Sequence, residues 1–159
     1  MMLADEINAQ GLRLDLERLL RMALLHDWAE TRVGDMPRTA THYFGAEERK
    51  RAEGRAFADI VAGAGDAAAQ YQELFDDYEQ RNSIEARIVK AADVIDLLVQ
   101  AYALERAGAK GLDEFWDVAI DADFELPAVA QKVVSEVLDS LVAERRKLNQ
   151  AQTGIRAGC

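Results

Sequence analysis

Apolar residues recur at helical spacing through most of this chain, and this pattern constrains the fold more than any other feature. In the stretches 16–24 and 84–102 the apolar side chains fall three or four residues apart, which places them on one face of an α-helix. No segment alternates apolar and polar residues convincingly, as a half-buried strand does. Only two prolines occur in 159 residues. The sequence therefore predicts an all-α fold.

Local signals divide this pattern into helices. Gly11 ends the first, and the Asp15 carboxylate caps the second, which Gly34 ends. Asn82 and Glu85 have the spacing of a capping box and open the longest helix. The expected helices span residues 2–10, 15–34, 47–61, 66–80, 82–106, 113–120 and 127–147. A loop is expected at 35–45. The buried edge of the helix over 66–80 is expected to consist of Tyr71, Leu74, Phe75 and Tyr78. We expect one domain over residues 1–147, followed by a polar tail over 148–159.

The charge of the chain excludes some classes of partner. A formal net charge of −10 repels phosphate backbones and anionic lipid, which argues against nucleic-acid and membrane-surface binding. A small anionic substrate stays compatible with this charge where a metal supplies local positive charge. Cys159 is the only cysteine, so no disulfide forms within the chain. With no signal peptide and no membrane-spanning run, we expect a cytoplasmic protein.

The residues that can carry chemistry concentrate in one short stretch. His26 and Asp27 end an apolar helical run, and Glu30 follows one turn later, beside both on a helix. Far downstream, Asp93 lies at the edge of the apolar stripe of its own helix. A buried carboxylate needs a cation or several donors. A divalent metal between the two helices would satisfy both the His26-Asp27 pair and Asp93. A ligand set of one imidazole with carboxylates suits a transition metal.

Simpler interpretations exist for each of these residues. An adjacent His-Asp pair occurs by chance, and Asp93 could be paired with Lys90 or Arg87. Glu30 could pair with an arginine, and Gly34-Asp35 could be a plain helix stop and turn. His42 stands in a polar stretch and is expected to face solvent, whereas Trp28, Phe115 and Trp116 are expected in the core.

The combined spacing is more specific than any single pair. His26-Asp27-x-x-Glu30-x-x-x-Gly34-Asp35-x-Pro37, followed by Lys90-x-x-Asp93, resembles the HD-domain metal-dependent phosphohydrolases. It is most similar to their 5′-deoxynucleotidase-like branch, and residues 74–79 and 83–93 support that branch. The resemblance covers residues 1 to about 145 and implies an HD-domain helical bundle.

The resemblance also implies roles for individual residues. His26, Asp27 and Asp93 match metal ligands for a divalent ion such as Mn, Co, Fe, Ni, Zn or Mg. Glu30 matches the residue that orients or deprotonates the attacking water, and Asp35 matches an acid near the leaving group. The implied substrates are (deoxy)nucleoside 5′-monophosphates or similar small phosphomonoesters, and the implied assembly is a homodimer or larger oligomer.

The sequence also departs from that family. In members of that family, the first metal-binding His and an Arg-Trp pair that contacts the nucleotide lie upstream of the His-Asp pair. No His precedes His26 in this sequence, and the Arg-Trp pair has no counterpart. Residues 1–7 look like the end of the helix that would carry the missing His, so we expect an N-terminally incomplete HD domain. Three hypotheses follow: a metal-dependent phosphomonoesterase; a degenerate HD domain that binds nucleotides or proteins; and a plain helical interaction domain with an accidental motif.

Overall fold

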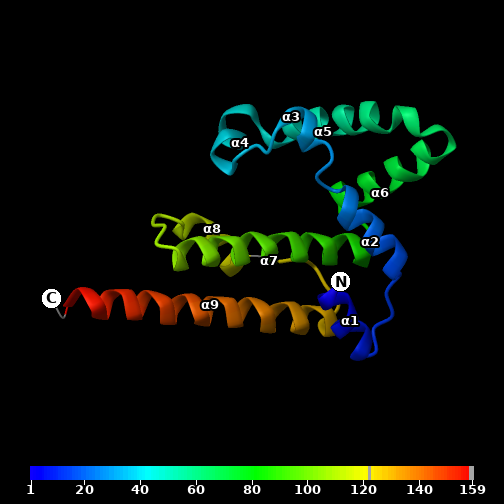
Figure 1. Cartoon of the computed structure of the whole chain (residues 1–159). Coiled ribbons are helices and arrows are strands. Elements are labelled where there is room, and N and C mark those ends of the chain that lie inside the picture. The colour runs from blue at the N-terminus through cyan, green and yellow to red at the C-terminus, as the bar shows by residue number, and fades with distance from the viewer. Residues whose placement is uncertain (122, 158–159) are drawn as a thin grey trace. The chain divides into compact units, whose positions relative to one another are not determined.

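All regular elements of the structure are helices, as predicted (Figure 1). The structure is a computed structural model that describes residues 1–121 and 123–157, without the side chains of residues 38, 39, 41, 118–121 and 152–157. The chain divides into two compact units, Met1–Arg13 with Lys90–Cys159, and Leu14–Val89. The single domain expected over residues 1–147 stays a prediction.

The unit Leu14–Val89 is built from short helices. They are α2 (Leu16–Leu25), α3 (Glu30–Val33), α4 (Arg38–Phe44), α5 (Ala46–Val61), the 3₁₀ helix η1 (Ala62–Ala67), α6 (Ala68–Gln80) and the first residues of α7 (Ile84–Arg106). α5 and α6 fold back on each other through η1, and α2 packs against α6. The Phe57 and Phe75 rings stack with centroids 4.1 Å apart. Leu19, Met22 and Leu25 bury the inner face of α2.

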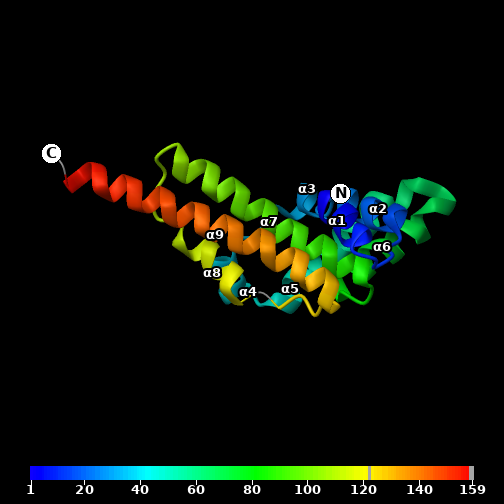
Figure 2. The same ribbon diagram turned by 90° about the horizontal axis from the view of Figure 1, so that it is seen from below.

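The other unit consists mainly of long helices. They are α1 (Met2–Ala9), α7 from Lys90 onward, α8 (Asp113–Asp121) and α9 (Ala128–Ala157). α7 and α9 lie side by side in both ribbon views (Figures 1 and 2). The core between them and α8 consists of Ala91, Val94, Leu98, Ala101, Trp116, Phe124, Val134 and Leu138. Burying each large apolar side chain contributes roughly 1.5–3 kcal/mol.

α9 extends further than the sequence suggested. It continues to Ala157, through most of the expected tail at 148–159. Residues 158 and 159, including the lone cysteine, lie outside the described residues. No helix in the described part of the chain has the length and apolar character needed to cross a membrane.

The helix expected over residues 15–34 is interrupted. Asp15 caps it as predicted, accepting a hydrogen bond from the Arg18 N–H at 3.0 Å. α2 then ends at Leu25, and the N–H groups of Trp28 and Glu30 bond to carbonyls three residues back. The buried face of α2 includes Leu25 and not Leu24, which is 76% exposed. The break lets the chain turn away where the apolar stripe ends.

Two further local predictions were wrong. Residues 38–44 of the expected loop form α4, and Pro37, at its entrance, is a helix-start signal. The cap of α7 is Ser83 rather than Asn82, because the Ser83 Oγ accepts the Ala86 N–H at 3.0 Å. The Glu85 carboxylate accepts the Asp15 N–H at 2.8 Å. That partner is distant in sequence, so the spacing of residues 82 and 85 could not reveal it.

Candidate functional site

His26 is held at the C-terminal end of α2 by contacts on both ring nitrogens. Its Nδ1 lies 2.8 Å from the carbonyl oxygen of Ala23, one turn back. Its Nε2 lies 3.0 Å from Oδ2 of Asp27. The His26 side chain is 17% exposed and the Asp27 side chain 56% exposed. The structure therefore brings His26 and Asp27 together, with Asp27 open to solvent.

The chemistry of this pair calls for a cation. Both nitrogens face oxygen acceptors, and a neutral imidazole has only one N–H to donate. Either the ring carries a second proton, or Nε2 and the carboxylate share a positive ion. Metal-binding histidines commonly donate their other N–H to a backbone carbonyl, as Nδ1 can do here. Ligand bonds of about 2.1 Å put neighbouring ligand atoms about 3.0–3.4 Å apart, so the pair fits a shared metal ion.

Glu30 and Asp35 follow in the same unit. Glu30 is half-buried and begins α3. In the tighter i→i+3 turns of residues 26–30, Asp27 and Glu30 are three apart and lie on the same side. Asp35 is exposed, beyond Gly34, whose φ of 79° ends α3 in a conformation that favours glycine.

Asp93 lies on α7 in the other unit, and its contact there is the ion pair considered from sequence. The Lys90 ammonium reaches Oδ2 of Asp93 at 2.7 Å, and both side chains are about one third exposed, at 32% and 33%. α7 is one continuous helix from Ile84 to Arg106, so it joins Asp93 to the first residues of α7 in the unit of His26. The meeting of Asp93 with His26 and Asp27 stays a prediction.

Sequence reasoning did not assign a role to Tyr78, which contacts His26. The two rings meet edge to face, with centroids 5.1 Å apart and an interplanar angle of 67°. Tyr78 is 8% exposed. The sequence placed it on the buried edge of α6 but gave no signal of its neighbour, because α2 and α6 are far apart in the chain.

The residue before it, Asp77, joins three elements. Its buried carboxylate accepts hydrogen bonds from Arg18 of α2, at 2.7 and 3.2 Å, and from the backbone and hydroxyl of Ser83, at 2.9 and 2.7 Å. Burial raises the pKa of Asp77, but the bonds from Ser83 and Arg18 outweigh it, so the pKa lies below its ordinary value. The hydrogen bond to Asp77 raises the pKa of Arg18. Asp77 is therefore a charged anchor.

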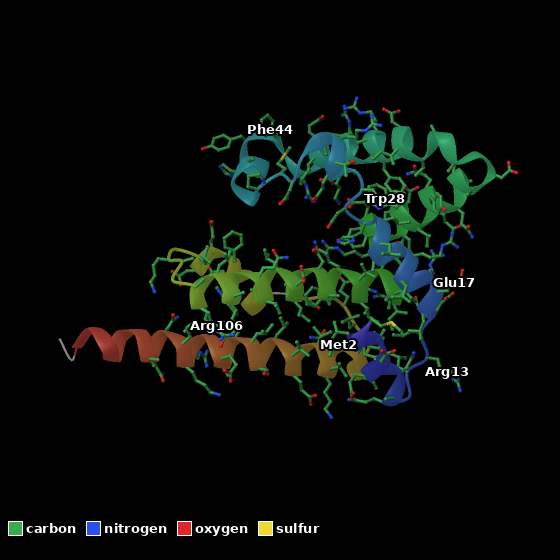
Figure 3. The ribbon with its side chains drawn as sticks, in the orientation of Figure 1. Met2, Arg13, Glu17, Trp28, Phe44 and Arg106 are labelled. Carbon is green, nitrogen blue, oxygen red and sulfur yellow. The ribbon has the colours of Figure 1, made fainter. Side chains whose placement is uncertain are left out.

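The surroundings expected for His42 and the two tryptophans are confirmed in part. His42 is exposed, as expected, and Trp116 is buried in the core. Trp28, which is labelled in Figure 3, was expected in the core. It is 40% exposed, and its ring packs against the rings of Phe57 and Tyr71.

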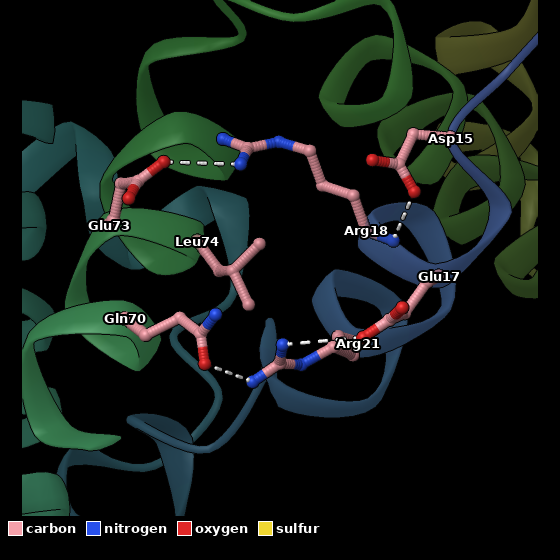
Figure 4. A pocket seen from close by; sticks show the side chains of 7 residues that line it. All are labelled: Asp15, Glu17, Arg18, Arg21, Gln70, Glu73 and Leu74. Atoms are coloured by element: carbon pink, nitrogen blue, oxygen red, sulfur yellow. Dashed lines mark hydrogen bonds and ion pairs between the residues drawn. The ribbon is translucent and has the colours of Figure 1, made fainter. Parts of the chain in front are cut away.

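A pocket of about 200 Å³ lies between α2 and α6. It is lined by Asp15, Glu17, Arg18, Arg21, Gln70, Glu73 and Leu74 (Figure 4). Its arginines are already paired, Arg18 with Glu73 at 3.1 Å and Arg21 with Gln70 at 2.8 Å. None of the site residues predicted from sequence lines it.

Comparison with known proteins places these observations in a family. Residues 1–122 match the HD domain. The chain is 35% identical over 113 residues to the 5′-deoxynucleotidase YBR242W of Saccharomyces cerevisiae, covering 65% of this chain and 46% of that protein. It is 34% identical over 128 residues to the human 5′-deoxynucleotidase HDDC2, covering 79% of this chain and 61% of that protein. The chain thus spans less than two thirds of these relatives.

Solved structures agree with the expected fold. A conserved hypothetical protein from Pyrococcus furiosus matches with a TM-score of 0.74 and 32% identity, covering 89% of this chain and 75% of that one. The PH0347 protein from Pyrococcus horikoshii matches with a TM-score of 0.71 and 31% identity, covering 88% and 73%. The all-α fold predicted from sequence is confirmed.

Proposed function

The chain belongs to the HD-domain family, and from that premise we propose that it is a metal-dependent phosphohydrolase. Its substrates are deoxynucleoside 5′-monophosphates or similar small phosphomonoesters, in keeping with the relatives named 5′-deoxynucleotidase. The observation that carries the proposal is the His26–Asp27 pair, whose Nε2 and Oδ2 lie 3.0 Å apart, a separation that two neighbouring ligands of one metal ion can have.

We assign the divalent ion to His26, Asp27 and Asp93, with water completing its coordination. When bound, such an ion lowers the pKa of water and polarises a phosphoryl oxygen. His26 contributes the nitrogen ligand and is oriented through Nδ1 by the Ala23 carbonyl. Asp27 is exposed, so its carboxylate can also meet a solvent-borne substrate. Lys90 neutralises part of the Asp93 charge. The donor set favours Mn, Co, Fe, Ni or Zn and also admits Mg.

Two acids are proposed for the proton chemistry. Glu30 begins α3, on the same side of the turn as Asp27, and orients or deprotonates the attacking water. Asp35 follows the positive-φ glycine at the end of α3 and acts near the leaving group.

Assembly and compartment belong to the same proposal. The aromatic side chains of Tyr43 and Phe44 on α4 are 85% and 65% exposed. Burial between two copies would remove them from water. We therefore propose a homodimer or larger homo-oligomer. A cytoplasmic location suits a chain with one cysteine, which can form no internal disulfide.

The test is phosphate release. The purified chain is loaded separately with Mn²⁺, Co²⁺ and Zn²⁺ and incubated with dAMP, AMP and a generic phosphomonoester. Metal-dependent release that is lost in both His26→Ala and Asp93→Ala supports the proposal. Metal and nucleotide binding without release would favour the degenerate-domain alternative. The absence of bound metal and release, in this chain and in a version extended to the length of its relatives, would reject the proposal.

A further inference from the structure

We propose that Tyr78 is a positioning residue for His26, and that its ring fixes the imidazole in the orientation that presents Nε2 beside Asp27. The observation is the buried edge-to-face contact of the two rings, with centroids 5.1 Å apart. The inference rests on the proposed function, because it concerns a side chain that we assign to the metal ion.

His26 needs such support because of its place in the chain. It is the C-terminal cap of α2, and the next residues turn away through i→i+3 hydrogen bonds. Nδ1 lies 2.8 Å from the Ala23 carbonyl and Nε2 lies 3.0 Å from Oδ2 of Asp27, so residues of the same short segment contact both nitrogens. A ring contact from another helix ties the direction of Nε2 to the packing of the unit.

Tyr78 provides this ring contact from a rigid position. Its side chain is only 8% exposed, and T-shaped ring pairs are a favourable geometry. The preceding residue, Asp77, accepts four hydrogen bonds from Arg18 and Ser83. Because Arg18 belongs to α2, the same short segment of α6 holds α2 near its start through Asp77 and near its end through Tyr78.

Three variants separate positioning from packing. Tyr78→Phe keeps the ring, and Tyr78→Leu removes it but leaves an apolar side chain. Tyr71→Leu is the matched control, because Tyr71 is a partly buried tyrosine on the same helix whose ring contacts Trp28 and Arg21. Circular dichroism first establishes a temperature at which all variants are folded, and every comparison is made there.

The first readout needs no metal. The chain has two histidines, so NMR of the imidazole N–H groups is assigned with a single His42→Ala variant. We expect a hydrogen-bonded Nδ1–H signal from His26 in the wild type, Tyr78→Phe and Tyr71→Leu. In Tyr78→Leu this signal broadens or disappears, because the ring is no longer fixed against the Ala23 carbonyl.

The second readout is Co²⁺ affinity, followed by visible absorption. Loss of a residue that orients a ligand typically weakens metal binding about 10–100-fold, so we expect this loss in Tyr78→Leu, with near wild-type affinity in Tyr78→Phe and Tyr71→Leu. Wild-type binding with unchanged affinity and an unchanged Nδ1–H signal in Tyr78→Leu would overturn the Tyr78 proposal alone. If the wild-type chain binds no Co²⁺, Mn²⁺ or Zn²⁺, the proposed function fails, and with it any role of Tyr78 in metal binding.

Discussion

Each compact unit contains an arginine that binds a buried carboxylate. In the unit Leu14–Val89, Arg18 reaches from α2 to Asp77 at 2.7 Å. In the other unit, Arg145 reaches from α9 to Glu105 of α7 at 2.8 Å, and its guanidinium lies 4.8 Å from the centroid of the Trp116 ring. Each arginine also pairs with an exposed second acid, Glu73 or Asp113. The two ion-pair networks are therefore built alike.

Their surroundings differ. Arg145 is the better buried, with a side chain 15% exposed against 30% for Arg18. Burial lowers the pKa of Arg145, but the hydrogen bonds to Glu105 and Asp113 outweigh it and raise the pKa. Its network joins α7, α8 and α9 beside an apolar core. The Arg18 network adjoins Tyr78, which contacts His26. We therefore expect the Arg145 network to act on stability alone, whereas the Arg18 network should also act on the proposed site through Tyr78.

The largest expected effect is the loss of metal-dependent activity when His26 is replaced. We expect His26→Ala to lower metal-dependent phosphate release roughly 10²–10³-fold, because metal catalysis contributes several kcal/mol to the barrier and each 1.4 kcal/mol is tenfold. A phosphate assay measures it. His42→Ala, at an exposed position, is the control and should retain activity. Equal losses in both variants would contradict the assignment of His26.

The next largest effect concerns the ion-pair network of Arg145. Glu105 is 6% exposed, and its replacement leaves Arg145 without its buried partner. We expect Glu105→Ala to lower the free energy of unfolding by about 3–5 kcal/mol. Each unit holds one of the two tryptophans, so urea unfolding is followed by Trp116 fluorescence in a Trp28→Phe background. The control Asp113→Ala, at an exposed acid, should cost about 0.5 kcal/mol or less.

Breaking the other network should affect both stability and the site. We expect Asp77→Asn to lower the free energy of unfolding by roughly 2–3 kcal/mol, less than Glu105→Ala because Arg18 is more exposed. It should also weaken Co²⁺ binding, which Glu105→Ala should leave unchanged. Trp28 fluorescence in a Trp116→Phe background and Co²⁺ titration are the measurements. Asp76→Asn, at the exposed neighbouring acid, is the control. Equal affinity losses in Asp77→Asn and Glu105→Ala would abolish the distinction between the networks.

The same carboxylate predicts a pH dependence. The pKa of Asp77 is lowered in the folded state, so the folded state favours the ionised form. Its contribution is complete above the unfolded-state pKa of about 3.9 and is lost as pH falls through the lower folded-state pKa. The difference in unfolding free energy between wild type and Asp77→Asn should be constant near neutral pH and shrink below about pH 4. A difference that grows on acidification would contradict this sign.

The smallest effect concerns the start of α7. Ser83→Ala removes the hydroxyl that caps Ala86 N–H and donates to Asp77, and we expect a loss of about 1–2 kcal/mol. Asn82→Ala, at the position that the sequence pattern favoured as the cap, should change stability by about 0.5 kcal/mol or less. Urea midpoints compare the two variants.

Much of the architecture was readable from local sequence signals. The Asp15 cap, the break at residues 63–65 and the end of the long helix at Arg106 are confirmed, because caps, glycines and apolar periodicity act over a few residues. The same signals failed at residues 26–29 and 38–44. There, the burial of Leu25 in place of Leu24 and the packing of α4 against α5 decided the backbone.

The order of residues alone specified the helical class, the HD-domain resemblance and the adjacency of His26 and Asp27, since neighbours in the chain are neighbours in space. Only the folded structure revealed that Tyr78 contacts the imidazole, that Asp77 binds Arg18, and that Glu85 accepts a bond from Asp15. These contacts join residues 52, 59 and 70 positions apart. Such pairings depend on how helices pack, and helical periodicity identifies a buried face without identifying the face that covers it.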